Sequence, residues 1–205
     1  MKNIKIISTL GPATLNKKIL NSIKRDIDIF RLNMSHLSLD ELTKNLKFLR
    51  QNNIKNICLD TEGAQVRTLK TKKRYFKINT KIELSCIYKT KNNIIQLYPK
   101  FSFKKIKVKS KILIGFNGLK LKVTNVTYDK LYCKVVEPGY LESNKGVHIY
   151  SELKLDPLTQ KDREAIEIAK KFDVKIFALS FANSETDVSI LKKIIPKKSI
   201  IISKI

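Results

Sequence analysis

Arginine and acidic residues are scarce in this 205-residue chain, although it is strongly basic. Only six of its 42 cationic side chains are arginines, and 18 Asp and Glu residues leave a formal net charge of +24. Sequence-specific nucleic-acid readers favour the planar guanidinium group for base edges and phosphates. The lysines are spread along the chain among many Ile and Asn residues, which is typical of a compositional bias. We therefore expect a solvated lysine-rich surface. A nucleic-acid-binding basic protein stays a remote alternative, so nucleic acid is not an expected partner.

Cysteine and long apolar runs are also rare. Cys58, Cys86 and Cys133 are too few and too far apart for a disulfide framework or a zinc site, so reduced thiols in a cytoplasmic protein are expected. No run of about 18 apolar residues exists, which excludes a spanning helix and a membrane location. Gly11 interrupts the first apolar segment, which speaks against a signal peptide. With 42% hydrophobic residues the chain can bury a core.

Short apolar segments alternate with amphipathic helical segments at the two ends of the chain. Strands are expected at 4–9, 28–32, 54–59, 174–181 and 199–205, with helices at 16–25, from 39 onward, 159–172 and 184–195. Thr159 and Ser184 are suited to capping the last two helices. Strands separated by helices of this length predict βαβ units and a parallel sheet. The expected fold class is α/β, as a partial (βα)8 TIM-type barrel of five strands and four helices.

The middle of the chain has a different pattern. Apolar and polar residues alternate at 81–88, 94–98, 105–109, 111–114, 119–126 and 131–136, with breaks at Lys-Asn-Asn, Phe-Asn-Gly and Pro-Gly. This alternation predicts a small antiparallel β domain. We therefore expect an incomplete barrel domain at 1–68 and 149–205, and an inserted all-β lid domain at 69–148.

Polar side chains follow the predicted barrel strands, where the functional groups of a parallel α/β barrel collect. The candidates are Arg31, Asn33, Ser35, Asp60, Thr61, Arg67 and Lys204. The hard oxygens among them suit an alkali or alkaline-earth cation. The two guanidinium groups suit phosphate, and a lysine at a strand end can neutralise a phosphoryl group in transfer. These residue types and positions predict a phosphate-handling site.

Structural alternatives exist for several of these residues. Taken alone, Asn33 and Ser35 fit better as hydrogen-bonding partners of the loop into the next helix. Asp60 can cap a loop, Lys204 can lie in a frayed terminus, and His36 fits a supporting hydrogen bond better than a metal ligand. Neither GxxxxGK[ST] nor GxGxxG occurs, so the common nucleotide-binding loops are absent.

Seven segments make the chain resemble the pyruvate kinase family in collinear order. They span residues 7–14, 30–36, 59–68, 143–147, 156–162, 178–181 and 203–205. The motifs Arg-Leu-Asn-x-Ser-His and Leu-Asp-Thr-x-Gly-x-x-x-Arg, in this order and separation, are the most specific. The resemblance implies glycolytic transfer of a phosphoryl group from phosphoenolpyruvate to ADP, giving pyruvate and ATP with Mg²⁺ and K⁺ as cofactors. It also implies that the insert is the family's lid.

The resemblance implies a role for each matching residue. The potassium ligands match Asn33, Ser35, Asp60 and Thr61. The lysine that stabilises the transferring phosphoryl group matches Lys204, which we expect to be catalytic together with Arg31. Nucleotide and phosphate contacts match Arg67, Pro12, His36 and Lys145.

Departures from the family pattern limit these implications. Glu62, Ala64 and Gln65 stand where the family has Lys, Pro and Glu, and the change at Gln65 speaks against potassium dependence. The lid sequence Asp-Asp-Gly is replaced by Phe-Asn-Gly at 116–118. The family's magnesium carboxylates come after the position of Ile205, so this chain is assigned no magnesium ligand.

The expected function is a pyruvate kinase-like phosphotransferase that is truncated or degenerate, so that the isolated chain is inactive. It would be completed as a homo-oligomer or by a second chain. The alternative is a non-catalytic pyruvate kinase-like interaction module.

Overall fold

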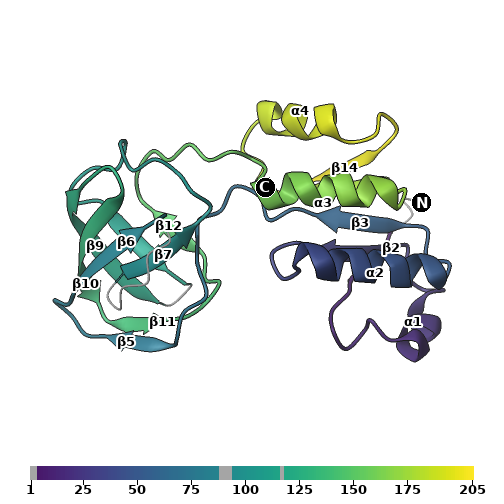
Figure 1. Cartoon of the computed structure of the whole chain (residues 1–205), viewed down its shortest axis with the longest axis horizontal. Helices are drawn as coiled ribbons and strands as arrows, with labels where there is room; N and C mark the ends of the chain where they lie inside the picture. The colour runs from purple at the N-terminus through teal and green to yellow at the C-terminus, as the bar shows by residue number, and fades with distance from the viewer. Residues whose placement is uncertain (1–3, 88–93, 116–117) are drawn as a thin grey trace. The chain divides into compact units, whose positions relative to one another are not determined.

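The computed structural model describes residues 4–87, 94–115 and 118–205, which form two compact units (Figure 1). Met1–Ala64 with Asp156–Ile205 form one, here called the barrel unit, and Gln65–Leu155 form the insert unit. The insert unit therefore starts four residues before the predicted boundary and ends seven residues after it. The earlier start has a structural reason, because Arg67 and Thr68 pair with Tyr98 and Leu97 of the insert.

The barrel unit contains a five-stranded parallel sheet in the order β1-β2-β3-β13-β14. Its strands are β1 (Ile7–Thr9), β2 (Ile29–Asn33), β3 (Ile57–Asp60), β13 (Ile176–Leu179) and β14 (Ile200–Ser203). Its helices are α1 (Lys17–Ile23), α2 (Leu39–Gln51), α3 (Gln160–Lys171) and α4 (Glu185–Ile194). This is the predicted α/β class with five strands and four helices, a partial barrel.

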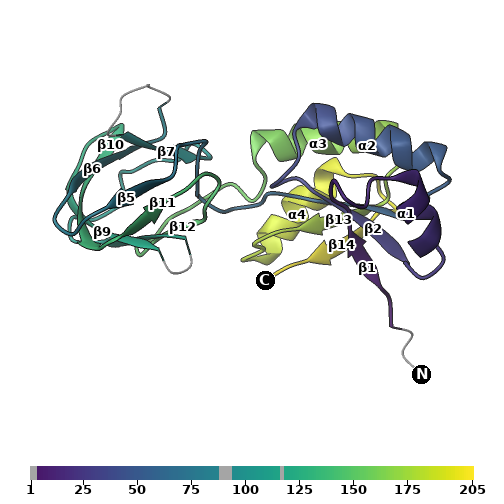
Figure 2. The same ribbon diagram turned by 90° about the horizontal axis from the view of Figure 1, so that it is seen from below.

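All four helices pack on one face of this sheet. Leu42, Leu46 and Leu49 recur at helical spacing along α2 and are fully buried in the main core, which Ile166 of α3 and Leu191 of α4 join. Figure 2 shows α2 and α3 side by side on this face. The opposite face carries a smaller apolar cluster of Ile29, Cys58, Ile176, Ala178 and Ile202. The two faces of the sheet are therefore apolar, and the predicted polar residues lie at the ends of its strands.

The insert unit consists of two β-sheets around a separate apolar core. Its larger sheet has the order β12-β8-β9-β10-β6-β7-β4, and β11 pairs with β5 in a two-stranded ribbon. The strands are β4 (Arg67–Thr68), β5 (Arg74–Phe76), β6 (Lys81–Ser85), β7 (Ile94–Tyr98), β8 (Lys111–Ile114), β9 (Leu119–Val126), β10 (Lys130–Glu137), β11 (Gly139–Leu141) and β12 (Val147–Ile149).

The insert differs from the sequence prediction in two ways. Residues 105–109 are not a strand: Ile106 N–H bonds to Phe103 O and Ser110 N–H to Lys107 O, which closes two turns. Ile106 is buried, so one inward apolar residue imitates the alternation of a strand. The sheet is also not wholly antiparallel, because β6 and β7 run parallel. Tyr88, the predicted Lys-Asn-Asn break at 91–93 and residues 116–117 lie outside the described residues.

Within the described residues, no helix is both long and apolar enough to span a lipid bilayer.

Candidate functional site

Two cations converge on one buried carboxylate at the end of β3. Asp60 is fully buried, and its Oδ2 accepts a 2.7 Å hydrogen bond from Arg31 Nε and an ion pair from the Nη2 of the same guanidinium. Lys204 Nζ lies 2.7 Å from each carboxylate oxygen. The structure thus brings together the two residues predicted to be catalytic, with Asp60 between them.

The register of the parallel sheet explains this convergence. Asn33 at the end of β2 and Ala178 on β13 both lie level with Asp60 on β3. Lys204 follows β14, where its N–H bonds to Leu179 O and its carbonyl accepts from Ala182 N–H, both at 2.9 Å. Lys204 is therefore fixed by backbone hydrogen bonds on both sides, so the alternative of a frayed terminus does not apply.

Ser180 connects the ends of β3 and β13. Its Oγ donates its single proton to Thr61 O at 2.6 Å and lies 3.1 Å from Asp60 Oδ1, while its N–H donates to Thr61 Oγ1 at 3.1 Å. Gly63 has φ +73°, and a Cβ there would overlap the Ser180 carbonyl. A glycine is required because the loop after β3 passes directly against this backbone.

Both cations keep donors that Asp60 does not use. A guanidinium has five N–H groups; Arg31 directs Nε and Nη2 to Asp60 and Nη1 to Thr9 Oγ1 at 2.6 Å, which leaves two. The side chains of Arg31 and Lys204 are 25% and 39% exposed, whereas Asp60 is inaccessible. The site can therefore present N–H donors from two neighbouring positive charges to an anion.

The four residues predicted to bind potassium lie next to one another, but their acceptors are partly used. Asn33 Oδ1 accepts the Ser35 N–H at 3.1 Å, which is the loop hydrogen bond considered as the alternative for this pair. Asp60 already accepts from Arg31 Nε and Nη2 and from Lys204 Nζ, and Ser180 Oγ lies 3.1 Å from its Oδ1. A potassium ion at Asp60 would therefore share this carboxylate with two cationic side chains, and the predicted potassium ligands remain predictions.

Pro12 and His36 lie on the surface of the barrel unit. Pro12 is exposed in the turn after β1, which is closed by hydrogen bonds from Thr14 and Leu15 N–H to Gly11 O. His36 is exposed, and its N–H donates to Asn33 O at 3.1 Å. Neither side chain contacts the Asp60 cluster, so their predicted nucleotide contacts remain predictions.

Arg67 and Lys145 form a second set within the insert unit. Thr68 N–H donates to Lys145 O and Lys145 N–H donates to Thr68 Oγ1, both at 2.9 Å. Arg67 Nη1 lies 3.4 Å from Asn144 O. Lys145 Nζ also pairs with Glu142 at 3.2 Å. The structure thus brings these two predicted phosphate contacts together with each other.

A buried polar cluster at the start of α3 was not predicted from the sequence. Asp162 is fully buried and accepts from the N–H groups of Glu62, Gly63 and Thr159 at 2.7, 3.2 and 3.0 Å. Burial raises the pKa of Asp162 above its ordinary value, and the three N–H donors partly oppose this effect. Thr159 and Asp162 form a capping box, and this Thr-x-x-Asp spacing is the sequence signal from which the cluster could have been predicted.

Lys161 connects this cluster to both site loops. Its Nζ donates to Glu62 Oε1 at 2.8 Å and to Met34 O at 2.7 Å, and Thr159 Oγ1 donates to Glu62 Oε2 at 3.1 Å. Met34 lies between Asn33 and Ser35, and Glu62 follows Thr61. The N-terminus of α3 therefore holds the loops that carry the predicted ligands. Glu62, which departs from the family pattern, supplies the carboxylate for this contact.

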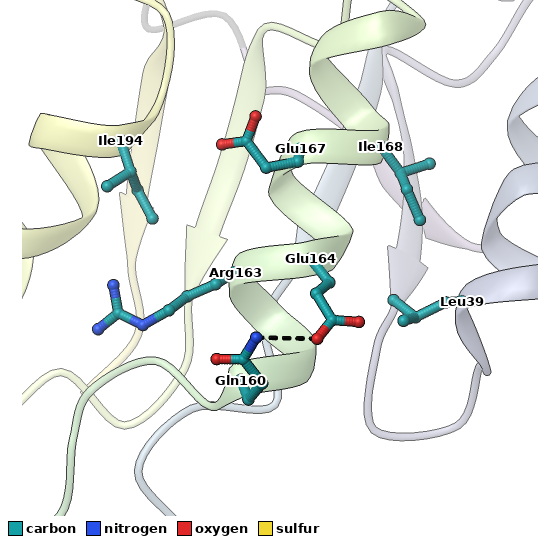
Figure 3. Close-up of a pocket in the computed structure, with 7 residues that line it drawn as sticks. All are labelled: Leu39, Gln160, Arg163, Glu164, Glu167, Ile168 and Ile194. Atoms are coloured by element: carbon teal, nitrogen blue, oxygen red, sulfur yellow. Dashed lines mark hydrogen bonds between the residues drawn. The ribbon is translucent and has the colours of Figure 1, made fainter.

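A groove of about 490 Å³ lies elsewhere in the barrel unit, among three helices. Figure 3 shows its lining residues, which are Leu39 of α2, Ile194 of α4 and Gln160, Arg163, Glu164, Glu167 and Ile168 of α3. Gln160 Nε2 donates to Glu164 Oε1 at 2.9 Å, one turn further along α3 (Figure 3). None of the predicted site residues lines this groove, so the strand ends and not the groove are the candidate site.

Comparison with known proteins identifies the family of the chain. The family model described as "Pyruvate kinase, barrel domain" matches residues 1–205. The chain belongs to the pyruvate kinase family. It is 30% identical to the pyruvate kinase of Lactobacillus delbrueckii subsp. bulgaricus over 202 residues, 92% of this chain and 34% of that protein.

Two further relatives match a similar stretch. Identity is 29% to the pyruvate kinase of Buchnera aphidicola subsp. Schizaphis graminum, covering 96% of this chain, and 32% to that of Methanocaldococcus jannaschii, covering 95%. The chain covers 44% and 41% of the length of these two relatives. It therefore spans less than half the length of each of the three pyruvate kinases compared.

Proposed function

We propose that this chain is part of a pyruvate kinase-type phosphotransferase that moves a phosphoryl group from phosphoenolpyruvate to ADP in the cytoplasm, as a step of glycolysis. The observation that supports this most is the pair of cations, Arg31 and Lys204, on the buried carboxylate of Asp60. Family membership adds the reaction class.

The site residues suit the charge that develops in this reaction. The bond from phosphorus to the enol oxygen of phosphoenolpyruvate breaks, a terminal oxygen of ADP takes the phosphoryl group, and the enolate takes up a proton at carbon to give pyruvate. Arg31 and Lys204 have free donors for the phosphoryl oxygens, and Asp60 keeps the two positive charges side by side. Arg67 and Lys145 of the insert unit are proposed to contact the nucleotide, and Pro12 and His36 of the barrel unit are proposed to have the same role.

The metal requirements of the proposal differ between the two ions. A divalent magnesium ion supplies charge neutralisation on the phosphoryl and enolate oxygens. Within the described parts of the chain, no three His, Cys, Asp or Glu side chains lie close enough to hold a metal ion together. Magnesium is therefore proposed to use carboxylates outside these residues. No step is assigned to potassium, because Gln65 stands where the family has glutamate and Asp60 already pairs with two cations.

The partners of the proposed enzyme follow from the partial barrel. β1 and β14 are the edge strands of a five-stranded sheet that has helices on one face only. We propose that a second copy or another chain completes it.

A coupled assay tests the proposed activity. Purified chain is supplied with phosphoenolpyruvate, ADP and Mg²⁺, and pyruvate is followed by NADH oxidation through lactate dehydrogenase. Because magnesium is proposed to use carboxylates outside the described residues, we expect turnover by the chain alone to stay near background. When a chain that completes the barrel is added, turnover should require all three components and be lost in Lys204→Met but not in Lys198→Met, an exposed lysine of the same unit. If no completed assembly forms pyruvate above background, the non-catalytic interaction module becomes the better account.

A further inference from the structure

The excess positive charge of the chain is concentrated in the insert unit. Residues 65–155 carry 21 Lys and Arg against five Asp and Glu, a formal charge of +16, whereas the barrel unit carries 21 against 13, or +8. The proposed phosphoryl transfer uses only Arg67 and Lys145 of the insert. Most of this charge therefore has no part in the proposed reaction.

One face of the insert combines this charge with exposed aromatic rings. β5 and β11 form the two-stranded ribbon seen together in Figure 1, and Tyr75 and Tyr140 lie directly opposite each other in its register. Their ring centroids are 5.1 Å apart at an interplanar angle of 59°, and the residues are 51% and 55% exposed. Two large rings are thus available to solvent at adjacent positions.

Lysines flank these rings. Lys73 Nζ lies 4.7 Å from the centre of the Tyr140 ring, and Lys77, two residues after Tyr75, is exposed just beyond the end of β5. Glu142 pairs with Lys73 at 3.0 Å and thereby holds it beside the ring. No acidic residue occurs between positions 62 and 83. We call Lys73, Tyr75, Lys77 and Tyr140 the tyrosine face.

We propose that the tyrosine face binds single-stranded nucleic acid without sequence preference. Lysines neutralise backbone phosphates, and stacking on tyrosine tolerates any base because every base has a π-face. The scarcity of arginine argues against base-specific contacts but not against this mode, which requires none. An acidic protein would also meet the charge, but it would gain little from a pair of exposed rings.

Binding of fluorescein-labelled oligouridylate, followed by fluorescence anisotropy with the full chain, tests the stacking. Tyr75→Ala/Tyr140→Ala is expected to raise Kd by about tenfold or more. The matched control, Tyr128→Ala/Tyr150→Ala, removes two other exposed tyrosines from the same unit and is expected to change Kd less than about twofold. Circular dichroism establishes that each variant is folded. Equal weakening by both pairs, or by neither, would overturn the proposal.

Salt dependence tests the phosphate contacts. Lys73→Gln/Lys77→Gln should reduce the slope of log Kobs against log salt concentration by about 1.4, since each phosphate contact to a single strand contributes about 0.7. Lys197→Gln/Lys198→Gln makes the same change of net charge in the barrel unit and should leave the slope unaltered. If polyglutamate binds as tightly as oligouridylate and the tyrosine variant does not distinguish them, the face is a general polyanion or protein surface instead.

Discussion

In the barrel unit the buried side chains include charged groups, whereas the insert unit keeps its charges at the surface. The buried acidic residues among the described ones are Asp60, Glu62 and Asp162, and all three belong to the barrel unit. The insert core is apolar, and its buried polar residues are Thr68 and Ser85. Burying a charge is costly unless hydrogen bonds and ion pairs compensate it, so such groups mark where the fold holds a specific geometry.

Removal of a buried carboxylate from the barrel unit should therefore lower the free energy of unfolding far more than removal of a surface carboxylate from the insert unit. Asp162→Ala leaves three buried N–H groups without their acceptor, and we expect the free energy of unfolding to fall by about 3 kcal/mol or more. Glu137→Ala removes an exposed ion pair with Lys120 and should cost less than about 1 kcal/mol.

Two buried cysteines make this comparison measurable in each unit separately. Burial raises the pKa of Cys58 in the barrel unit and of Cys133 in the insert unit to about 12, so alkylation requires opening of the structure. In a urea titration with iodoacetamide, Asp162→Ala should expose Cys58 at lower urea and leave Cys133 unchanged. An equal shift at both cysteines would show that the two units do not respond independently.

Loss of the contact between Lys161 and Glu62 should lower the free energy of unfolding less than Asp162→Ala does. Lys161→Met removes the ammonium that joins Glu62 to the Met34 carbonyl, and we expect a loss of about 1–3 kcal/mol because Glu62 is nearly buried. Glu62→Gln should recover part of this loss in the double variant, since it removes the buried negative charge that has lost the Lys161 ammonium and keeps only neutral donors such as Thr159 Oγ1. Additive effects of the two substitutions, measured by urea unfolding, would show that the pair is not coupled.

The raised pKa of Asp162 predicts a pH dependence confined to the barrel unit. Because the pKa is higher in the folded state, folding takes up a proton between pH 3.8, its ordinary pKa, and the raised pKa. This contribution to the free energy of unfolding is therefore present at low pH and is lost as the pH rises through the raised pKa. Asp162→Asn should remove this slope, as urea unfolding followed by Cys58 alkylation at several pH values can show. The same slope in both proteins would contradict the assignment.

Added salt should produce the smallest difference in stability between the two units, and it should stabilise the insert unit more than the barrel unit. A unit of charge +16 repels itself more than one of +8, and added NaCl screens exposed charges. We expect protection of Cys133 from alkylation to increase with NaCl by less than about 1 kcal/mol, and that of Cys58 to change less. A greater effect at Cys58 would reverse the comparison.

The alternation of short apolar runs with amphipathic helices was enough to predict the barrel elements, because helix and strand periods differ clearly and each run is buried on a defined face. It failed at 105–109, where one buried isoleucine in a turn imitates a strand. Short strands such as β4, β5 and β11 escaped because two or three residues carry no readable period.

The residues of the site could be predicted from the sequence, but the ion pairs between them could not. Arg31, Asp60 and Lys204 stood out by their place after strands, since parallel strand ends meet at one edge. That both cations would pair with the carboxylate of Asp60 depends on side-chain distances that no spacing encodes. The cluster of Lys161 and Asp162 was missed for the same reason, although its capping box was visible.

The central claim is that Arg31 and Lys204 form an anion site organised by Asp60, and the binding of phosphoenolpyruvate tests it most directly. Isothermal titration calorimetry of the wild-type chain should detect binding, Lys204→Met should weaken it by about tenfold or more, and Lys198→Met should leave it unchanged. Replacing KCl by tetramethylammonium chloride at equal ionic strength should change Kd less than about twofold. Equal affinity in wild type and Lys204→Met, or no binding to the wild-type chain, would contradict the account.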